Sequence, residues 1–469
     1  MAPVTRIGII GGGPGGYEAA LVAAQLGAEV TVVDSDGLGG SAVLTDCVPS
    51  KTLIATAESM SDIAESGPLG VRIGAGGSPE GQVAVDLALV NARVRHLARA
   101  QSDDIAARLD KEGVAVLRGK GRLEGRSHIV AELADGTAET VAVDAVLVAT
   151  GAHPRELPDA VPDGERILNW EQVYGLEALP EHLVVVGSGV TGAEFASAFT
   201  VLGSQVTLIS SRDRVLPGED ADAATVLEDV FRRRGMTVLS RSRAGQVRRT
   251  SSGVQVSLVG GGTVEGSHCL MAVGSLPNTA GLGLEEAGVR LDKGGYVEVD
   301  RVSRTSTPSV YAAGDCTGVL MLASVAAMQG RIAMWHALGD AVTPLNLRSV
   351  SSNVFTDPEI ATVGWTQQDL DETTNDTVVV KLPLATNARA KMQGVSDGFV
   401  KLFARTGSGT VVGGVVVAPR ASELIYPVAL AVDVRLTVDQ LAHSFTIYPS
   451  ISGSIAEAAR QLHTKVWRS

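Results

Sequence analysis

The sequence predicts an α/β protein in which one strand–turn–helix–strand unit occurs twice. The first observation is a repeat. RIGIIGGGPGGYEAALVAAQLGAEVTVVD, residues 6–34, aligns without a gap with HLVVVGSGVTGAEFASAFTVLGSQVTLIS, residues 182–210. The second is composition, because a chain that is 45% hydrophobic and has 54 glycines suits a compact α/β fold and excludes disorder. The third is length, since 469 residues make about three domains of roughly 150 residues each.

Each copy of the repeat has a Gly-x-Gly-x-x-Gly run between its first strand and its helix. In such a run the first glycine makes the turn, the second lets backbone approach a pyrophosphate, and the third lets helix pack on strand. The helix N-terminus then faces the phosphate charge. One match is weak, but two in the right context predict two Rossmann-like nucleotide sites. The runs are Gly11-x-Gly13-x-x-Gly16 and Gly187-x-Gly189-x-x-Gly192.

The residues at the ends of the second strands differ between the copies. Asp34 ends the first, where an acid can accept hydrogen bonds from both ribose hydroxyls of an adenosine. Ser210 takes the corresponding place in the second, and Ser211, Arg212 and Arg214 follow it. Without an acid there, nothing repels a 2′-phosphate, and the arginines can attract it. We therefore expect both NADPH and NADH to be used; the alternative is that these arginines are only solvated.

Charge and cysteine usage narrow the class of protein further. The net charge of −13, with scattered charges, excludes a basic nucleic-acid footprint and argues against an anionic membrane surface. No apolar stretch reaches the roughly 18 residues of a membrane span, and no leader precedes the first strand, so we expect a cytoplasmic protein. The three separated cysteines, Cys47, Cys269 and Cys316, fit a reducing compartment. No metal-ligand spacing occurs among the cysteines and the eight histidines, so no metal is predicted.

Four further motifs follow the first fingerprint in a fixed order, and with them the chain resembles the flavoprotein disulfide reductases, most of all the dihydrolipoamide dehydrogenases. The resemblance covers essentially the whole length. It implies FAD in the first unit, NAD(P) in the second, an Asp315 that binds the flavin ribityl chain, and a homodimer. The motifs are Ala149-Thr150-Gly151 with Pro154, residues 272–279 (AVGSLPNT), residues 310–315 (VYAAGD) and residues 354–364 (VFTDPEIATVG).

The resemblance also implies the order of the domains. The FAD-binding domain comprises residues 1–150 and a second, central part at 271–345, and the NAD(P)-binding domain at 151–270 is inserted between them. A C-terminal α+β dimerisation domain occupies residues 346–469. A reading from the residues agrees, because a strand that ends in Gly314-Asp315, far from Gly11, must return to some sheet.

The redox centre departs from the family. Cys47 matches the flavin-proximal cysteine of the family's pair, which has four residues between its two members. The partner has become Ala42, which has no nucleophile. In the family's His-Pro-Thr-x-x-Glu, which supplies a base from the other subunit, Tyr448 replaces the His and Gly453 the Glu. A tyrosine with an ordinary pKa near 10 is a poor base at neutral pH. Disulfide reduction by the family's mechanism is therefore not expected.

The flavin half of the machinery is kept. Lys51 and Glu194 match the pair that lies beside the flavin in the family, where a cation near N5 tunes it. The alternative is a surface lysine and a glutamate in an ordinary first-turn dipole contact. Cys47 is either a low-pKa thiol that cycles through a sulfenic acid or mixed disulfide, or a remaining small packing residue, and we favour packing.

These features predict an NAD(P)H dehydrogenase that passes hydride from NAD(P)H through FAD to a quinone-type acceptor. Three alternatives are an NAD(P) transhydrogenase, a single-cysteine reductase of persulfides or mixed disulfides through Cys47, and a regulatory subunit related to dihydrolipoamide dehydrogenase. The predicted catalytic residues are Lys51, Glu194, Cys47 and Tyr448. The predicted cofactor-binding residues are Gly11, Gly13, Pro14, Gly16, Asp34, Ser35, Gly40, Ser41, Cys47, Lys51, Ala149, Thr150, Gly151, Gly187, Gly189, Val190, Gly192, Glu194, Ser210, Ser211, Arg212, Gly274, Gly314, Asp315, Met321, Leu322 and Ala323.

Overall fold

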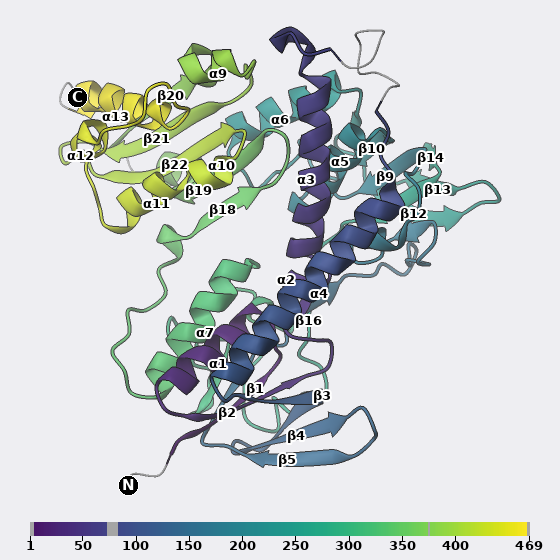
Figure 1. The fold of residues 1–469 in the computed structure, drawn as a ribbon, viewed down its shortest axis with the longest axis vertical. Helices are drawn as coiled ribbons and strands as arrows, with labels where there is room; N and C mark the ends of the chain where they lie inside the picture. The colour runs from purple at the N-terminus through teal and green to yellow at the C-terminus, as the bar shows by residue number, and fades with distance from the viewer. Residues whose placement is uncertain (1–3, 73–82, 374–375, 467–469) are drawn as a thin grey trace. The chain divides into compact units, whose positions relative to one another are not determined.

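A computed structural model describes residues 4–72, 83–373 and 376–466 of the chain (Figure 1). The chain divides into two compact units, each made of three separate stretches of sequence. Unit 1 comprises residues 1–52, 91–155 and 274–346, and unit 2 comprises residues 53–90, 156–273 and 347–469. Each unit is described by itself.

Unit 1 contains a seven-stranded sheet in the order β17-β6-β1-β2-β3-β4-β5. Its parallel part runs from β17 to β3, and β4 and β5 continue it as an antiparallel meander. The strands are β1 Arg6–Ile10, β2 Glu29–Asp34, β3 Ala115–Glu124, β4 His128–Leu133, β5 Ala138–Ala142, β6 Ala145–Val148 and β17 Val310–Ala312, with a separate pair β7 Ala152–Pro154 and β16 Ser275–Pro277. The helices are α1 Pro14–Gln25, α2 Gly40–Leu44 and α7 Ala323–Ala337, with a 3-10 turn η3 at Asp315–Thr317.

The parallel strands of unit 1 form where the sequence has uninterrupted apolar runs, as expected for strands that are covered on both faces. Helices α1 and α7 lie side by side in Figure 1. They approach closely because a Cβ at Gly330 would lie 2.1 Å from the carbonyl oxygen of Gly15, so only glycine fits there. Strand β17 pairs with β6, which confirms that the strand before Gly314 returns to the first sheet.

Unit 2 contains the second copy of the repeat. Its parallel sheet has the order β11-β10-β9-β15-β8, and a three-stranded antiparallel sheet β12-β13-β14 lies beside it. The strands are β8 Ile167–Leu168, β9 His182–Val186, β10 Gln205–Ile209, β11 Thr237–Leu239, β12 Ala244–Arg249, β13 Val254–Leu258, β14 Thr263–Gly266 and β15 His268–Met271. The helices are α5 Val190–Leu202 and α6 Ala221–Arg233, with 3-10 turns η1 Gly67–Leu69 and η2 Val173–Gly175.

The C-terminal part of unit 2 is an antiparallel sheet in the order β18-β19-β22-β21-β20, covered by short helices. Its core is one cluster of apolar side chains from the sheet and from α11 and α13. The strands are β18 Ser351–Val354, β19 Glu359–Gly364, β20 Thr377–Pro383, β21 Phe399–Arg405 and β22 Val411–Ala418. The helices are α8 Gln367–Thr373, α9 Ala388–Met392, α10 Ala421–Leu424, α11 Tyr426–Asp433, α12 Val438–His443 and α13 Gly453–Val466, with 3-10 turns η4 Leu347–Ser349 and η5 Leu384–Thr386.

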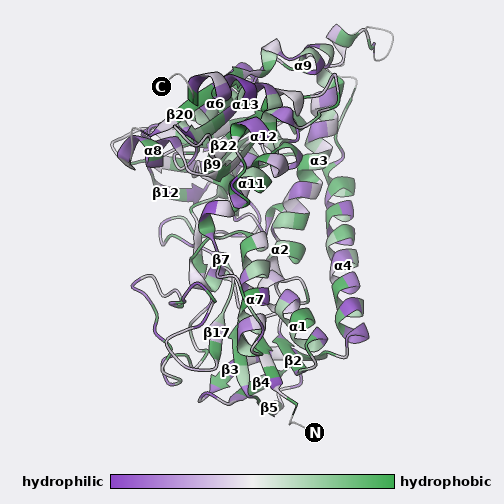
Figure 2. Cartoon of the chain, turned by 90° about the vertical axis from the view of Figure 1, so that its left-hand side faces the viewer, coloured by the Kyte–Doolittle hydropathy of each residue, from purple (hydrophilic) through white to green (hydrophobic). Residues whose placement is uncertain are grey.

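Two long helices, α3 (Cys47–Ala64) and α4 (Leu87–Lys111), carry the chain from one unit to the other. Along α4, buried positions recur every three or four residues from Leu87 to Ala98, and Ile105 and Leu109 follow with the same helical spacing. Hydrophilic and hydrophobic colours alternate along this helix in Figure 2. The Gly-rich sequence of residues 67–82, between these helices, predicts a surface loop. The stretch contains η1, and residues 73–82 lie outside the described residues.

The α/β architecture with two glycine-fingerprint units and a C-terminal α+β region is confirmed. No helix among the described residues has the length and apolar character that a bilayer crossing requires.

Candidate nucleotide and redox sites

The first glycine run lies between β1 and α1 and leaves room beside its middle glycine. A Cβ at Gly11 would lie 2.3 Å from the carbonyl oxygen of Ala149, and one at Gly16 would lie 1.8 Å from the carbonyl oxygen of Gly11. At Gly13 the nearest heavy atom would be the Cα of Gly40, 3.9 Å away. The outer glycines are therefore required by the protein's own packing, whereas the middle one faces free space, as a pyrophosphate cradle needs. Pro14 opens the helix and Gly13 provides no side-chain cap, so no side chain of the cap position covers the N-terminus of α1.

Asp34 lies beside the same loop. Its Oδ2 accepts a hydrogen bond from the N–H of Gly12 at 2.6 Å, and its Oδ1 accepts one from the N–H of Gly37 at 2.6 Å. Each carboxylate oxygen can accept more than one bond, so Asp34 can hold the loop and still accept from a ribose. Ser35 is exposed, and Gly40 and Ser41 begin α2 beside Gly13. The structure thus brings together the predicted residues of the first fingerprint.

The second glycine run repeats this geometry in unit 2. A Cβ at Gly187 would lie 2.1 Å from the carbonyl oxygen of Ala272, and one at Gly192 would lie 1.9 Å from that of Gly187. At Gly189 no heavy atom lies within 4 Å, and Val190 beside it is 42% exposed. Both runs therefore fit a dinucleotide pyrophosphate for the same reason: the outer glycines are closely packed and the middle glycine is not.

The turn that leads out of unit 1 is fixed by one asparagine. Asn278 donates from Nδ2 to the carbonyl of Thr150 at 2.9 Å, and Thr150 Oγ1 donates to the carbonyl of Asn278 at 2.6 Å. Strands β7 and β16 pair at the same point, which places Ala149, Gly151 and Gly274 around the crossing. Two motifs that lie far apart in the sequence thus meet as the two neighbouring segments of one crossover, residues 149–151 and 272–279.

The Gly314–Asp315 turn contains a residue that the sequence reasoning missed. Gln329 on α7 is 1% exposed and accepts from the N–H of Gly314 at 2.9 Å through Oε1. Its Nε2 donates to Thr317 Oγ1 at 3.4 Å, and Thr317 in turn donates to the carbonyl of Gly314 at 2.7 Å. A buried amide is a signal for such a role, because it must find partners. Gln329 therefore holds the turn that carries Asp315.

Asp315 itself is strongly affected by its surroundings. Burial, together with the negative charge of Asp46, raises the pKa of Asp315 to about 6. Three further predicted cofactor-binding residues follow this turn. Met321 and Leu322 precede α7, and Ala323 is its first residue. Met321 is 44% exposed.

The three thiols have very different surroundings. Cys47 is the first residue of α3 and is partly exposed. Cys316 is fully buried, and burial raises its pKa to about 11. Cys269 is also fully buried in β15, and burial raises its pKa. A thiol with a raised pKa stays neutral at pH 7 and is a poor nucleophile, so Cys47 is the one accessible thiol of the chain.

Glu194 on α5 is buried, with 4% of its surface exposed. Its Oε1 accepts from the backbone N–H of Phe355, in the loop between β18 and β19, at 2.9 Å. Lys51 lies one turn after Cys47 on α3 and is partly buried. Because Lys51 belongs to unit 1 and Glu194 to unit 2, their predicted pairing stays a prediction.

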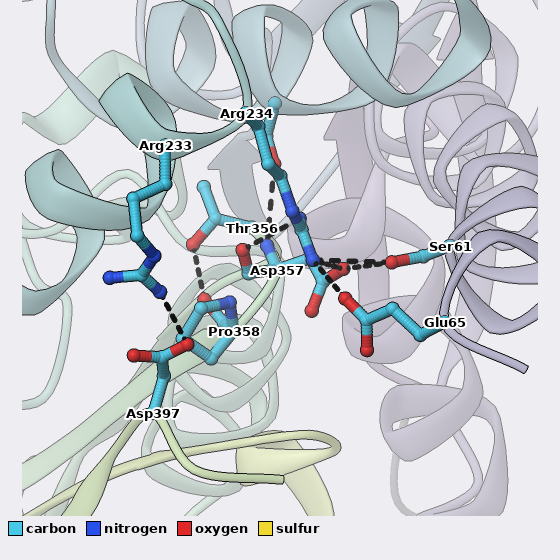
Figure 3. A network of polar contacts seen from close by, with 9 residues as sticks. Ser61, Glu65, Arg233, Arg234, Thr356, Asp357, Pro358 and Asp397 are labelled. Carbon is cyan, nitrogen blue, oxygen red and sulfur yellow. Dashed lines mark hydrogen bonds and ion pairs between the residues drawn. The ribbon is translucent and has the colours of Figure 1, made fainter. Parts of the chain in front are cut away.

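A polar network anchors the same loop in unit 2 (Figure 3). Arg234, just after α6, forms ion pairs with Asp357 at 2.7 Å and with Glu65 at 2.9 Å, and it donates to the carbonyl of Asp357 at 3.1 Å. Ser61 on α3 donates to Asp357 Oδ2 at 2.6 Å. The N–H of Asp357 donates to Ser197 on α5 at 3.3 Å. The loop that holds Glu194 is thus itself held by α3, α5 and the end of α6.

Ser210, at the end of β10, was expected among the nucleotide contacts. It is fully buried, and its hydroxyl accepts from Ser188 Oγ at 2.7 Å. Ser211 and Arg212 follow it as exposed residues. The side chain of Ser210 therefore lies inside the protein, where it is hydrogen-bonded to the glycine turn and to the loop after β10.

Tyr448 lies in unit 2 on an exposed apolar surface. Its relative exposure is 87%, and Phe445 and Ile447 beside it are 106% and 80% exposed. Tyr426, Leu430 and Val434, four residues apart along α11 and just beyond its end, are 64%, 42% and 60% exposed. Exposed apolar side chains grouped as in each of these two segments are typical of a protein–protein interface.

The described residues contain no group of three or more His, Cys, Asp or Glu side chains arranged to hold a metal ion.

Comparison with known families identifies the family to which these features belong. Residues 5–330 match the model of the pyridine nucleotide-disulphide oxidoreductases, and residues 350–459 match the dimerisation domain of the same family. Members of this family use FAD and a nicotinamide nucleotide.

Several individual proteins are similar along their whole length. A protein of Mycobacterium tuberculosis named NAD(P)H dehydrogenase (quinone) is 56% identical over 468 residues, which cover 98% of this chain and 94% of the relative. A dihydrolipoyl dehydrogenase of Chlorobaculum tepidum is 33% identical over 463 residues, covering 98% of this chain and 97% of the relative. The crystal structure of LpdA from M. tuberculosis has a TM-score of 0.93 at 55% identity, covering 98% of this chain and 100% of that one.

Proposed function

The chain belongs to the pyridine nucleotide-disulphide oxidoreductase family, and on that premise we propose that it is a flavin-dependent NAD(P)H dehydrogenase that reduces quinones. The observation that carries this proposal is the combination of two open nucleotide cradles with a single accessible thiol. A dithiol relay needs two sulfurs that can reach each other. Ala42 stands where the resemblance expects the second sulfur, and the other two cysteines are fully buried.

Bound FAD would supply the redox chemistry, taking a hydride equivalent from NAD(P)H and passing two electrons to an acceptor. The residues of unit 1 would hold it: the Gly11–Gly16 turn would face the pyrophosphate, Asp34 would accept from the ribose, and Asp315 stands on the turn that Gln329 holds. The segments near 1–150 and 271–345 form its domain. In unit 2 the Gly187–Gly192 turn would receive the nicotinamide nucleotide. Lys51 and Glu194 are the two residues to which the family resemblance gives a role beside the flavin.

A quinone fits as acceptor because it needs no thiol and no dedicated base. Quinones are flat and take two electrons, so a quinone that stacks on the flavin ring system would be placed for reduction without any further catalytic group. Tyr448, in place of a histidine, offers an aromatic ring where the disulfide reductases have a base. The M. tuberculosis relative is named NAD(P)H dehydrogenase (quinone), which supports the same acceptor here. The more distant relatives are named dihydrolipoyl dehydrogenases, which makes disulfide reduction the reading to exclude.

Rapid mixing tests the proposal on the flavin-loaded protein. One equivalent of NADPH or NADH without oxygen should bleach the flavin fully, with no long-wavelength band of the kind that a reduced dithiol enzyme shows. A pulse of quinone should then restore the yellow colour. Turnover of lipoamide or glutathione disulfide at a useful rate would overturn the proposal, and so would a flavin that no nicotinamide nucleotide reduces.

Replacing Cys47 with serine separates quinone reduction from single-cysteine chemistry. We expect Cys47→Ser to keep the rate of quinone reduction within about twofold, because a serine fills almost the same volume. A persulfide or mixed-disulfide reductase would lose its activity completely with this variant. Cys316→Ser, at a buried site, is the matched control for a general effect on folding.

We place the contact with a second copy of the chain on the two exposed apolar segments, residues 445–448 and α11. The match of residues 350–459 to a dimerisation domain supports a homodimer. The double variant Tyr426→Asp with Leu430→Asp puts two charges on this surface and is expected to give monomers in sedimentation velocity. Wild-type protein that sediments as a monomer at micromolar concentration would overturn the assignment, and Leu89→Asp, on the exposed face of α4, is the control.

The small number and wide separation of the cysteines also support a reducing compartment, and we place the protein in the cytoplasm on that ground.

A further inference from the structure

A buried amide on α7 fixes the backbone of the turn after β17. Gln329, which is 1% exposed, accepts from the N–H of Gly314 at 2.9 Å through its Oε1. Thr317 donates to the carbonyl of Gly314 twice, from its hydroxyl at 2.7 Å and from its N–H at 2.9 Å. Gly314 has a φ of +81°, a positive value that favours glycine. Both polar backbone groups of Gly314 are therefore bonded, and the partner of its N–H is a side chain 15 positions later.

Helix α7 is itself packed tightly against α1, the helix that begins at the first glycine run. A Cβ at Gly330, the residue after Gln329, would lie 2.1 Å from the carbonyl oxygen of Gly15 on α1. Because closely packed backbones resist sliding, Gln329 reaches Gly314 from a fixed position. Helix α7 thus connects the first glycine run with the turn that carries Asp315.

The acceptor on Gln329 matters because the N–H that it bonds has no access to water while the turn keeps its present form. A buried N–H that loses its acceptor bears the full cost of its desolvation. Without the acceptor, the turn has to move until the N–H of Gly314 reaches water or another oxygen, and Asp315 moves with it. A ligand that needs Asp315 in its present place must then restore the turn, and its affinity falls by that cost.

The amide also supplies its acceptor without adding a charge. Burial, together with the negative charge of Asp46, raises the pKa of Asp315 to about 6, so the turn already carries a carboxyl that is costly to ionise. An ionised acid at position 329 would add a second negative charge to the same buried region and disfavour the ionised form of Asp315 further. A neutral side chain avoids this repulsion.

We propose that Gln329 is a positioning residue for the flavin: by fixing the turn that carries Asp315, it sets the affinity of the protein for FAD. The proposal rests on the function proposed above, since it concerns the flavin through which the hydride passes. Neither the glycine fingerprints nor the motifs of the family resemblance include Gln329.

Release of FAD from the purified holoprotein tests the proposal without any turnover. The fluorescence of the released flavin, followed over a dilution series, gives the dissociation constant. Gln329→Met keeps the length of the side chain and removes the acceptor, and we expect it to raise the dissociation constant for FAD by roughly tenfold or more. Gln329→Asn, whose amide is one methylene group too short for Gly314, should do the same and replaces the methionine variant if that variant does not fold.

The conservative variant Gln329→Glu separates the acceptor from the shape of the side chain. At about pH 5.5 a buried carboxyl is protonated, matches the amide in size and still offers an acceptor. Its dissociation constant for FAD should then stay within about threefold of the wild-type value at the same pH. Gln461→Met, the same substitution on α13 in unit 2, is the matched control and should bind FAD as the wild type does.

An unchanged dissociation constant in Gln329→Met would overturn the proposal. An equal loss of FAD affinity in Gln329→Glu at this pH would also overturn it, because that result would point to the shape of the side chain and not to its acceptor. A failure of the dehydrogenase function gives a different result: the affinity for FAD depends on Gln329, but neither NADPH nor NADH reduces the bound flavin.

Discussion

Replacing Gly189 with alanine is expected to leave the protein folded and to weaken NAD(P)H binding by roughly ten- to a hundredfold, which corresponds to ~1.4–2.8 kcal/mol. The reason is the open space at this position. Gly189 has a φ of −71°, which alanine adopts without strain, and a Cβ there meets no heavy atom within 4 Å. The added methyl group therefore costs the apoprotein nothing but occupies the place where a pyrophosphate must approach the backbone.

Gly192→Ala provides the contrast, because the same change three residues later acts on the fold. A Cβ at Gly192 would lie 1.9 Å from the carbonyl oxygen of Gly187, so helix and strand must separate, at a cost of ~1–3 kcal/mol or more. Thermal unfolding and calorimetric titration with NADPH, measured on both variants, separate the two effects. If Gly189→Ala bound NADPH as tightly as the wild type, the second fingerprint would not be a nucleotide cradle.

Replacing Lys401 with methionine is expected to destabilise the protein by ~3–5 kcal/mol, the usual effect of removing one partner from a buried ion pair. The Lys401 side chain on β21 is 6% exposed and lies 2.9 Å from both Asp220 and Asp222. Asp220, whose side chain is 3% exposed, also caps α6 by accepting from the N–H groups of Asp222 and Ala223. Without Lys401 this buried carboxylate has no counter-charge. Urea unfolding should therefore show a lower midpoint with an unchanged slope.

Lys381 is the matched control, because it contacts the same Asp222 from the surface. Its side chain is 41% exposed, so Lys381→Met should change the free energy of unfolding by no more than ~1 kcal/mol. Equal effects of the two variants would contradict the importance of burial at Lys401.

The same cluster predicts a pH dependence. Burial raises the pKa of Asp222, but hydrogen bonds from Lys381 and Lys401 outweigh it, and the pKa is lowered overall. A carboxyl with a lowered pKa contributes stability above its unfolded-state pKa of about 3.9, and this contribution is lost as the pH falls through the lower folded-state value. Unfolding followed below pH 4 should therefore show a smaller acid-induced loss in Lys401→Met than in the wild type.

Much of the fold could be predicted from local patterns. The repeat of residues 6–34 at 182–210 predicted both strand–turn–helix–strand units, because apolar strands and glycine turns follow from neighbours in the chain. The loss of disulfide chemistry could also be predicted from the sequence. Ala42 has no thiol, and Gly453 has no carboxylate to orient a base. Asp34 beside the first glycine turn was predicted from spacing alone, and the hydrogen bond to Gly12 places it there.

Other features depend on residues that only the folded chain brings together. Gln329 lies 15 positions from Gly314 and 12 from Thr317, and no spacing rule links an amide on a helix to a turn before it. Ser210 stands where an acid would contact the ribose, yet the tertiary structure buries it, and its hydroxyl bonds to the glycine turn and to the loop after β10. Sequence alone determined that this protein has two nucleotide turns and lacks the second cysteine of a redox pair, because turns and side-chain chemistry are local properties. Tertiary structure alone decided which polar groups are buried and which distant residues meet, because burial and proximity depend on the packing of distant segments.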